Sequence, residues 1–304
     1  MKVTGLRVIE LPYIPCYGHD VKRTYVRREL DDYRLCGVYS KAGVPYEVRQ
    51  ALHNEEDYPE GGSKAYAALN HSVYLETVDG FKAGSCVLLT GGGCGHLVGI
   101  MGGLQQIYGK DSKIGLIWID AHGDFNTPET TLTGLMGGMP LAVIAGRCCD
   151  DWRLGGGLEV PIKTENIILT DGRNLDPLEE DAIKASDILF LDTAAFNDEA
   201  TWEKAITEFT NRLDAICVHI DADILDEKYV PDHYTPEPNG PSLETVIRNI
   251  RMVMRTGKVA AYSVLSVYHE AGKEGSEIST INGMRMIGAG LEEWKKYPPH
   301  SKAK

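Results

Sequence analysis

Two segments of the sequence carry metal-binding side chains at alternating positions, each directly after an apolar run. The first, IWIDAHGD, holds Asp120, His122 and Asp124, and the second, HIDADILD, holds Asp221 and Asp223. Side chains two residues apart in an extended chain point to the same side, so each segment presents its ligands together. A single D-x-D pair is commonly a solvated turn, but two such segments after predicted strands favour a site for divalent ions. Two ions such as Mn²⁺ would neutralise the four buried carboxylates.

A glycine-rich stretch, TGGGCGH, follows the apolar run at 85–89 and ends in Cys94, Gly95 and His96. Three interpretations are open for it: a phosphate cradle, half of a metal site, or a tight turn. The first is weak because no Lys-Ser or Lys-Thr pair follows the glycines, as it does in a P-loop. Cys94 is either a metal ligand or an inert small side chain in the turn.

The elements that must position these residues alternate between short apolar runs and helix-like stretches. Strands are predicted at 85–89, 115–119, 167–170, 188–191, 215–220 and 258–264, and helices near 97–108, 136–146, 177–186, 198–213 and 243–256. Continuous apolar runs are typical of strands that are covered on both faces in a parallel sheet. We predict one α/β domain over residues 1–304, with three αβα layers around a mostly parallel, doubly wound sheet. Segment 12–80 has no clear assignment.

The composition narrows the class of protein. The 304 residues carry a formal net charge of −13 and no block rich in Lys or Arg, which excludes nucleic acid or an anionic membrane as the main partner. No window approaches the length of about 20 apolar residues that a membrane span needs, and the first residues do not resemble a signal peptide. The seven cysteines are scattered and odd in number, which fits a reducing cytoplasm better than a disulfide framework. We expect a soluble, cytoplasmic protein.

The order of a glycine-rich strand end, DAHGDFNTPETT and HIDADILDEKYVPDHYTP resembles the arginase/ureohydrolase superfamily of binuclear manganese hydrolases, over roughly residues 85–270. The resemblance implies an arginase-like fold and two Mn²⁺ ions. The implied metal ligands are Asp120, His122, Asp124, Asp221 and Asp223. Asn126, Thr133, Asp176 and Glu179 match positions that hold the amino-acid end of the substrate in some members, although caps and turn formers would account for them equally.

Three positions depart from the family pattern. Cys94 falls where the family has a metal-binding histidine, and a thiolate there would favour softer ions such as Zn²⁺ or Co²⁺. Gly137 stands where arginases carry a proton-shuttling histidine. Ser266 stands where a glutamate meets the substrate guanidinium, and we assign it to the substrate site. His233, His269 and Glu270 lie close in sequence to these positions and are either partial replacements or surface and structural residues.

The resemblance implies hydrolysis of a linear C–N bond by a metal-bridging hydroxide. Asp120 and Asp221 would bridge the ions, and Asp124 would bind one ion and accept a hydrogen bond from the hydroxide, as the catalytic residue. Without the glutamate, a less basic N-hydroxyarginine-like substrate is favoured over arginine. Two alternatives remain: a formiminoglutamase- or agmatinase-type hydrolase of another guanidino or formimino compound, and an inactive ureohydrolase-like binding protein. The resemblance also implies a homo-oligomer, a trimer or hexamer, acting on a small guanidino or amidino molecule.

Overall fold

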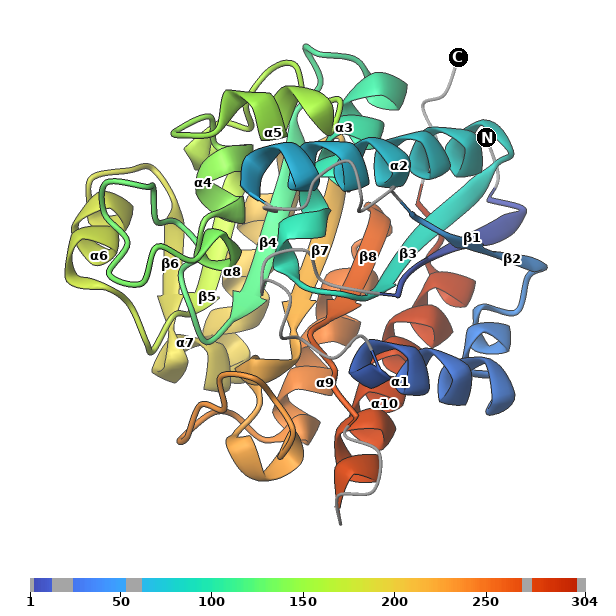
Figure 1. Cartoon of the computed structure of the whole chain (residues 1–304). Coiled ribbons are helices and arrows are strands. Elements are labelled where there is room, and N and C mark those ends of the chain that lie inside the picture. The colour runs from blue at the N-terminus through green and yellow to red at the C-terminus, as the bar shows by residue number, and fades with distance from the viewer. Residues whose placement is uncertain (1–2, 13–23, 53–61, 270–274, 300–304) are drawn as a thin grey trace.

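The centre of the molecule is an eight-stranded parallel sheet, seen in a computed structural model that describes residues 3–12, 24–52, 62–269 and 275–299 (Figure 1). The order of the strands across the sheet is β2-β1-β3-β8-β7-β4-β5-β6. Their bounds are β1 Gly5–Leu11, β2 Tyr46–Gln50, β3 Ser85–Gly91, β4 Ile114–Asp120, β5 Ile167–Asp171, β6 Leu189–Asp192, β7 Ala215–Asp221 and β8 Val259–Leu265.

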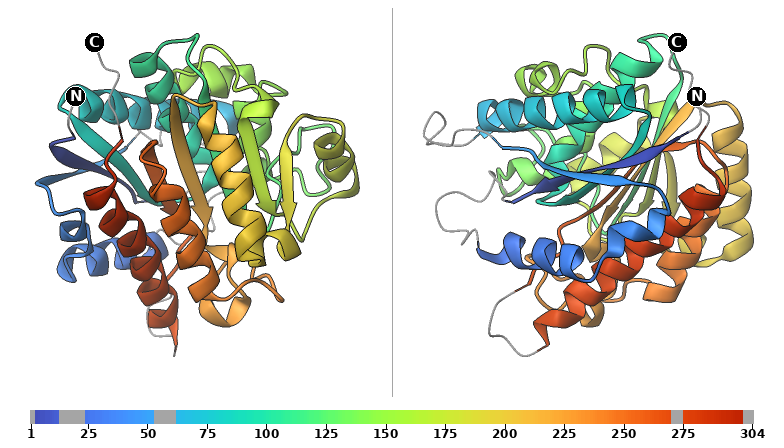
Figure 2. Two further views of the ribbon diagram at one scale, coloured as in Figure 1. Left: turned by 180° about the vertical axis from the view of Figure 1, so that it is seen from behind. Right: turned by 90° about the vertical axis from the view of Figure 1, so that its right-hand side faces the viewer.

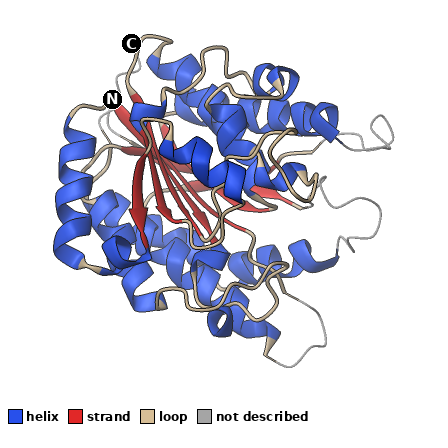
Figure 3. Cartoon of the chain, turned by 90° about the vertical axis from the view of Figure 1, so that its left-hand side faces the viewer, coloured by secondary structure: helices blue, strands red, loops and turns tan. Residues whose placement is uncertain are grey.

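Helices cover both faces of the sheet, as the edge views in Figures 2 and 3 show. One face packs against α2 Gly62–Lys82, α3 Leu97–Tyr108, α4 Pro140–Ile144, α5 Asp150–Gly155 and α6 Pro177–Lys184. The other packs against α1 Thr24–Leu35, α7 Thr193–Asn197, α8 Glu199–Asn211, α9 Leu243–Met254 and α10 Ser276–Lys296. Alternate residues of β4 pack into the hydrophobic cores on the two faces of the sheet. Leu116 and Trp118 lie in the core on the first face, and Ile117 and Ile119 lie in the core on the second. This arrangement confirms the predicted three-layer, doubly wound α/β fold.

The six predicted strands are all present, and the differences lie mainly in the helices. The helix predicted over 136–146 is shorter, because α4 begins only at Pro140, whose fixed φ and missing N–H suit the first helical position. It ends before Gly146, which has a φ of 73°. Segment 12–80, which had no assignment, contributes α1, β2 and most of α2. The N-terminal strand β1 and the helices α5 and α10 were not predicted either.

The glycine-rich stretch after β3 is a tight turn that lets α3 approach α2. Gly91 and Gly92 have φ values of 76° and 58°, a left-handed conformation that side chains disfavour. A Cβ atom on Gly99 would lie 2.4 Å from the backbone oxygen of Asn70, so only glycine allows this contact between the helices. The turn therefore holds Cys94 close to the carboxyl end of the sheet.

A buried side chain of α2 fixes the turn in place. Asn70 donates from Nδ2 to the carbonyl oxygen of Gly95 at 2.9 Å and accepts at Oδ1 from the N–H of Gly99 at 2.8 Å. It is fully buried. Both backbone groups belong to the segment that carries Cys94, so α2 positions this side of the pocket through one residue.

We expect Asn70→Ala to lower the free energy of unfolding by about 2–4 kcal/mol, because two buried backbone groups lose their partner. Urea denaturation followed by circular dichroism measures this. Asn211→Ala, at the exposed C-terminal end of α8, is the matched control and should change stability little. Equal stability of the two variants would show that Asn70 does not hold the turn.

No helix among the described residues is long and apolar enough to cross a membrane. That residues 1–304 form a single domain stays a prediction.

Candidate metal centre

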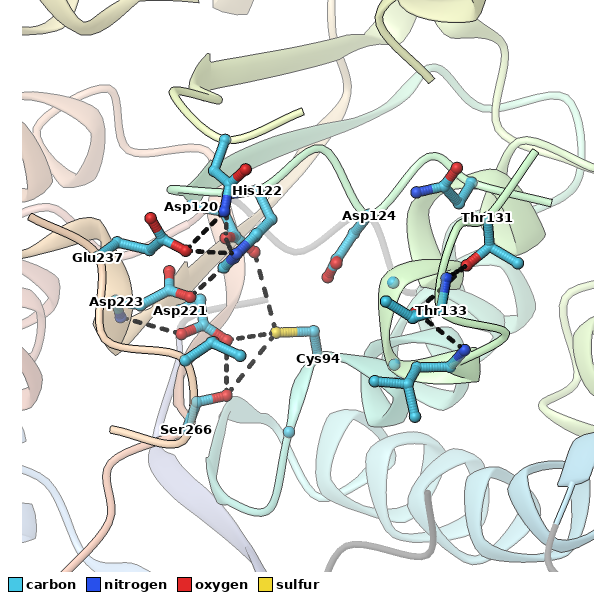
Figure 4. Close-up of a pocket in the computed structure, with 18 of the residues that line it drawn as sticks. Cys94, Asp120, His122, Asp124, Thr131, Thr133, Asp221, Asp223, Glu237 and Ser266 are labelled. Atoms are coloured by element: carbon cyan, nitrogen blue, oxygen red, sulfur yellow. Dashed lines mark hydrogen bonds and ion pairs between the residues drawn. The ribbon is translucent and has the colours of Figure 1, made fainter. Parts of the chain in front are cut away.

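A cavity of about 290 Å³ opens at the carboxyl ends of β3, β4, β7 and β8 (Figure 4). Because β8 and β7 lie between β3 and β4, segments far apart in the sequence end side by side there. The predicted site residues all line this cavity: Cys94, Asp120, His122, Asp124, Asn126, Thr133, Asp176, Glu179, Asp221, Asp223 and Ser266. Its volume suits a small molecule.

The first donor group consists of Asp120, His122 and Asp223, whose ligand atoms all lie within 4.8 Å of one another. His122 Nδ1 lies 2.9 Å from Asp223 Oδ2 and 3.5 Å from Asp120 Oδ1. His122 Nε2 lies 3.1 Å from Glu237 Oε1, which also accepts a hydrogen bond from Asn174 at 2.7 Å. A carboxylate on the second ring nitrogen is the usual way to orient a metal-binding histidine.

The second donor group shares Asp120 and adds Cys94, Asp221 and His219. The Cys94 Sγ donates to Asp221 Oδ2 at 2.6 Å and lies 4.0 Å from Asp120 Oδ2. Ser266 Oγ donates to the same Asp221 oxygen at 2.5 Å. Figure 4 shows the sulfur at the centre of these groups. Thiol and hydroxyl thus occupy the positions around one carboxylate that a cation would otherwise take.

His233 forms a third group with Asp221 and Asp223. Its Nε2 lies 3.1 Å from Asp221 Oδ1, and its ring is buried. Of the three residues weighed as replacements, His233 is therefore in the pocket. His269 is not among the described pocket residues and bonds instead to Thr280 Oγ1 at 2.9 Å. Glu270 lies outside the described residues.

Two side chains of the site are presented by strained backbone. Asp124 and Ser266 have φ values of 49° and 58°, in the left-handed region that non-glycine residues seldom adopt. The amides of Leu141 and Ala142 at the start of α4 hold the Asp124 carbonyl at 2.9 and 3.2 Å, and the Ser266 amide donates to Gly92 at 3.0 Å. Strain that the fold maintains in this way is a feature of functional sites.

The carboxylates of the cluster are buried close together, and each disfavours the charged form of its neighbours. Burial and the charges of Asp223 and Asp221 raise the pKa of Asp120. Burial and the charge of Asp120 raise the pKa of Asp124 well above its ordinary value. Asp124 Oδ2 is buried and has no hydrogen-bond partner in the part of the chain that the structure describes. Burial also raises the pKa of the Cys94 thiol.

The histidines have the opposite effect, because they favour the charged forms of the carboxylates beside them. Burial disfavours the charged form of Asp221, but the hydrogen bond and charge of His233, together with the hydrogen bonds from the Asp223 amide and Cys94, outweigh it and lower the pKa of Asp221. Burial likewise opposes protonation of His122, but the charge of Asp223 and the hydrogen bonds to Asp120, Asp223 and Glu237 together outweigh it and raise the pKa of His122.

These donors fit a pair of divalent ions. The groups overlap at Asp120, Asp221 and Asp223, so two neighbouring ions would share carboxylates. Asp124 Oδ2 is a buried acceptor that a cation would satisfy. Carboxylate and imidazole suit Mn²⁺, and the thiol of Cys94 adds a softer donor on one side.

The polar wall of the cavity is formed by the segment after Asp124 and the start of α6. Asn126 Nδ2 donates to Asp176 Oδ2 at 3.1 Å, and Thr133 is exposed at the rim. Both oxygens of Glu179 are occupied, accepting from the amides of Phe125 at 2.8 Å and Asp176 at 3.1 Å. Glu179 therefore positions the wall through the backbone, whereas Asn126, Asp176 and Thr133 keep polar atoms at the pocket.

Two of the three positions predicted to depart from the family pattern face the cavity from the segments after β4 and β8. Gly137 lines the pocket without a side chain, and Ser266 faces Asp221. His96 is buried, and its Nδ1 lies 2.5 Å from the Gly93 carbonyl oxygen, so the ring turns into the loop; His96 is not among the described pocket residues. Cys94, not the adjacent histidine, points at the carboxylates.

Sequence reasoning missed several residues that the fold brings to the centre. Glu237 and Asn174 come from loops after β7 and β5, and His219 comes from within β7. Of these, His219 had a detectable signal, because it stands two residues before Asp221 and so shares its side of the strand. Glu237 and Asn174 sit in turn-forming sequence and carry no such signal.

Comparison with known proteins identifies the family of this chain. The profile described as Arginase family matches residues 33–287, most of the chain. This chain belongs to the arginase family. Its sequence is 29% identical over 200 residues to the arginase of Bacillus caldovelox, covering 65% of this chain and 66% of the relative. It is 33% identical over 120 residues to the N(omega)-hydroxy-L-arginine amidinohydrolase of Streptomyces lavendulae, covering 40% of each protein.

Solved structures of arginase-family proteins share the fold. The arginase of Bacillus subtilis superposes with a TM-score of 0.80 at 23% identity, covering 95% of this chain and 98% of that one. The formimidoylglutamase of Bacillus subtilis gives 0.75 at 13% identity, covering 98% and 89%. In sequence, the chain spans about two thirds of the length of the arginases it matches.

We expect Asp124→Asn to stabilise the metal-free protein at neutral pH. A carboxyl whose pKa is raised on folding weakens the folded state as pH rises above its ordinary value of 3.8, and an amide removes that penalty. The unfolding midpoint in a chelator should rise by roughly 2–4 °C at pH 7, the shift that about 1 kcal/mol produces in a domain of moderate size. Below pH 3.8 the advantage should vanish.

Thermal unfolding followed by circular dichroism at several pH values measures the effect. With saturating Mn²⁺ the order should reverse, because a ligand at 100 times its dissociation constant adds about 2.7 kcal/mol per site to the wild type. A metal-free variant no more stable than the wild type at pH 7 would contradict the electrostatic account of Asp124.

Proposed function

We propose that this chain is a binuclear-metal hydrolase of a linear C–N bond in a guanidino or amidino compound. The observation that carries the proposal is the overlap of the donor groups at Asp120, Asp221 and Asp223 on the floor of one small cavity. Membership of the arginase family supports the same chemistry. Carboxylates shared between neighbouring groups are what two adjacent ions require.

The proposed cofactors are two Mn²⁺ ions, with Zn²⁺ or Co²⁺ as alternatives on the side of Cys94. Asp120, His122, Asp223 and Asp221 would hold one ion, and Cys94, Asp120, Asp124 and Asp221 the other. When bound, such ions lower the pKa of water to near neutrality and so supply a nucleophile for an electrophilic carbon.

The protein's own groups would orient the reactants and move the proton. Asp124 is buried in the cavity, and the carboxylate oxygen that does not bind an ion would take a proton from the attacking water. The polar ends of an amino-acid-like substrate would meet Asn126, Thr133 and Asp176 on the cavity wall. Tyr66 lines the cavity beside the glycine-rich turn and restricts its width.

Ser266 determines the favoured substrate. Its hydroxyl donates a hydrogen bond to Asp221. Because the residue is a serine, no carboxylate is present at this position to pair with a guanidinium. A less basic N-hydroxyguanidine needs that pairing less and provides a better leaving group, which suits the absence of a side chain at Gly137. The similarity to the Streptomyces lavendulae amidinohydrolase agrees with this choice. We propose an N-hydroxyarginine-like compound as the preferred substrate, with arginine second.

The test is release of urea, hydroxyurea or ammonia from arginine, hydroxyarginine, agmatine, guanidinobutyrate and formiminoglutamate by the Mn²⁺-loaded protein. We expect kcat/KM to be at least about tenfold higher for hydroxyarginine than for arginine, a difference of about 1.4 kcal/mol. A preference for formiminoglutamate or agmatine would replace the substrate but retain the hydrolase. No turnover of any compound, together with fewer than one metal per two chains, would indicate an inactive binding protein.

Asp223→Ala should abolish hydrolysis and remove about one metal per chain, because Asp223 contacts His122 in the first donor group and His233 in the third. Metal content by atomic emission and turnover with the best substrate check it. An Asp223→Ala protein that stays active with full metal content would end the binuclear proposal.

Cys94→Ser should weaken one metal site and spare the other, since serine keeps the size of the side chain but is a poorer ligand. The matched control is His96→Ala, two residues away, whose ring turns into the loop and should not affect the metal stoichiometry. Titration calorimetry with Mn²⁺ and Zn²⁺ resolves the two sites. If His96→Ala loses a metal and Cys94→Ser does not, the assignment of the glycine-rich turn is wrong.

Assembly into a trimer or hexamer and a cytoplasmic location remain predictions.

A further inference from the structure

The imidazole of His219 lies beneath the metal centre and belongs to no predicted ligand set. It is fully buried within β7 and is not among the described pocket residues. One ring nitrogen lies within 4.8 Å of ligand atoms of Cys94, Asp120 and Asp221. Two donors that bind one ion at 2.0–2.3 Å are at most about 4.4 Å apart, so shifts of a few tenths of an ångström would complete the set.

The hydrogen bonds of the ring indicate which nitrogen is available. His219 Nδ1 lies 2.9 Å from Ser263 Oγ on the neighbouring strand β8. The Ser263 hydroxyl in turn donates to the Val218 carbonyl oxygen at 3.4 Å, which leaves its oxygen as the acceptor of an Nδ1 proton. The Nε2 atom then carries the lone pair. A histidine that ligates a metal through one nitrogen commonly donates through the other in this manner.

The surroundings of His219 Nε2 also favour a role as a metal ligand. This nitrogen is buried and has no hydrogen-bond partner among the described residues. An unsatisfied buried polar atom lowers the free energy of unfolding by about 1–3 kcal/mol. An atom of this kind beside a cluster of acidic ligands is therefore a candidate for binding an ion. The ring of Trp118 packs on His219 with centroids 4.1 Å apart, and its Nε1 donates to Asp120 at 3.0 Å, so the imidazole is held in place.

We propose that His219 supplies the nitrogen ligand to the ion held by Cys94, Asp120 and Asp221. It would replace, from the strand beneath, the histidine that the family pattern has at position 94. A neutral imidazole adds a donor without adding negative charge to a site that already has a thiol and several carboxylates. This inference rests on the proposed binuclear function.

Wild-type protein loaded with Co²⁺ and labelled with ¹⁵N-histidine provides the direct test. A paramagnetic ion shifts the resonances of a bound imidazole strongly, and the Nδ1 proton held by Ser263 should appear as a shifted, slowly exchanging signal. His219→Gln should remove this signal and lower the affinity of one Co²⁺ site by about 100-fold, more than loss of an orienting partner alone. The thiolate-to-cobalt absorption from Cys94 should persist at saturating Co²⁺.

Ser263→Ala and His96→Ala complete the set of variants. Ser263→Ala should leave the shifted imidazole in place but speed the exchange of its proton, with an affinity loss of about tenfold. It decides the assignment even if His219→Gln fails to fold. His96→Ala removes a second buried histidine nearby and should alter neither the shifted signals nor the affinities.

Full retention of both affinities and of every shifted signal in His219→Gln would overturn the inference and leave the hydrolase proposal intact. With two Co²⁺ ions bound, the absence of any shifted imidazole proton that responds to Ser263→Ala would do the same. Wild-type protein that binds fewer than two Co²⁺ ions and hydrolyses nothing would instead refute the proposed function itself.

Discussion

Repulsion among buried carboxylates is the constraint on which the site depends. Asp120, Asp124, Asp221 and Asp223 converge where water has little access, and each ion removed from water costs several kcal/mol unless it is compensated. None of the described pocket-lining residues is Lys or Arg. Protons, the thiol of Cys94 and the neighbouring histidines balance this charge only in part. Divalent cations are therefore the partners we propose for this arrangement, and the fold brings the groups that could bind them together.

The sheet order and two strained turns achieve that assembly. The strands β8 and β7 separate β3 from β4, so four segments distant in sequence end at one edge. The left-handed backbone at Asp124 and Ser266 turns their side chains inward, and Gly91 and Gly92 carry the chain from β3 to Cys94. Helix α2 maintains this geometry through Asn70. The stability of the surrounding layers thus supports a local arrangement that is unfavourable by itself.

The three positions that depart from the family pattern implied by the sequence resemblance, Cys94, Gly137 and Ser266, all line the cavity. A thiol replaces an imidazole at Cys94, while a second imidazole, His219, lies under the same carboxylates. The hydroxyl of Ser266 bonds to Asp221 where a substrate-facing carboxylate would stand, and Gly137 leaves its side of the pocket open. Each change alters how charge is distributed around the ions and the substrate head group, and none removes a carboxylate ligand. This pattern agrees with the altered substrate that we propose.

The sequence alone was sufficient for the α/β class, for the six adjacent strands β3 to β8, and for five acidic or imidazole side chains that line the cavity. Periodicity and D-x-D spacing are local properties that a parallel sheet converts directly into position. It could not place α2, whose small and polar residues give little periodicity, or Glu237, which reaches His122 across a distance of 115 residues. His219 is the sharpest case. Its position on β7 follows from spacing, but its approach to Cys94 depends on the pairing of β7 with β8 and β4 and on the turn after β3. The residue types and their spacing within each strand are set by the sequence. The short distances between side chains of different strands, which a shared metal ion requires, arise only when the strands pack together.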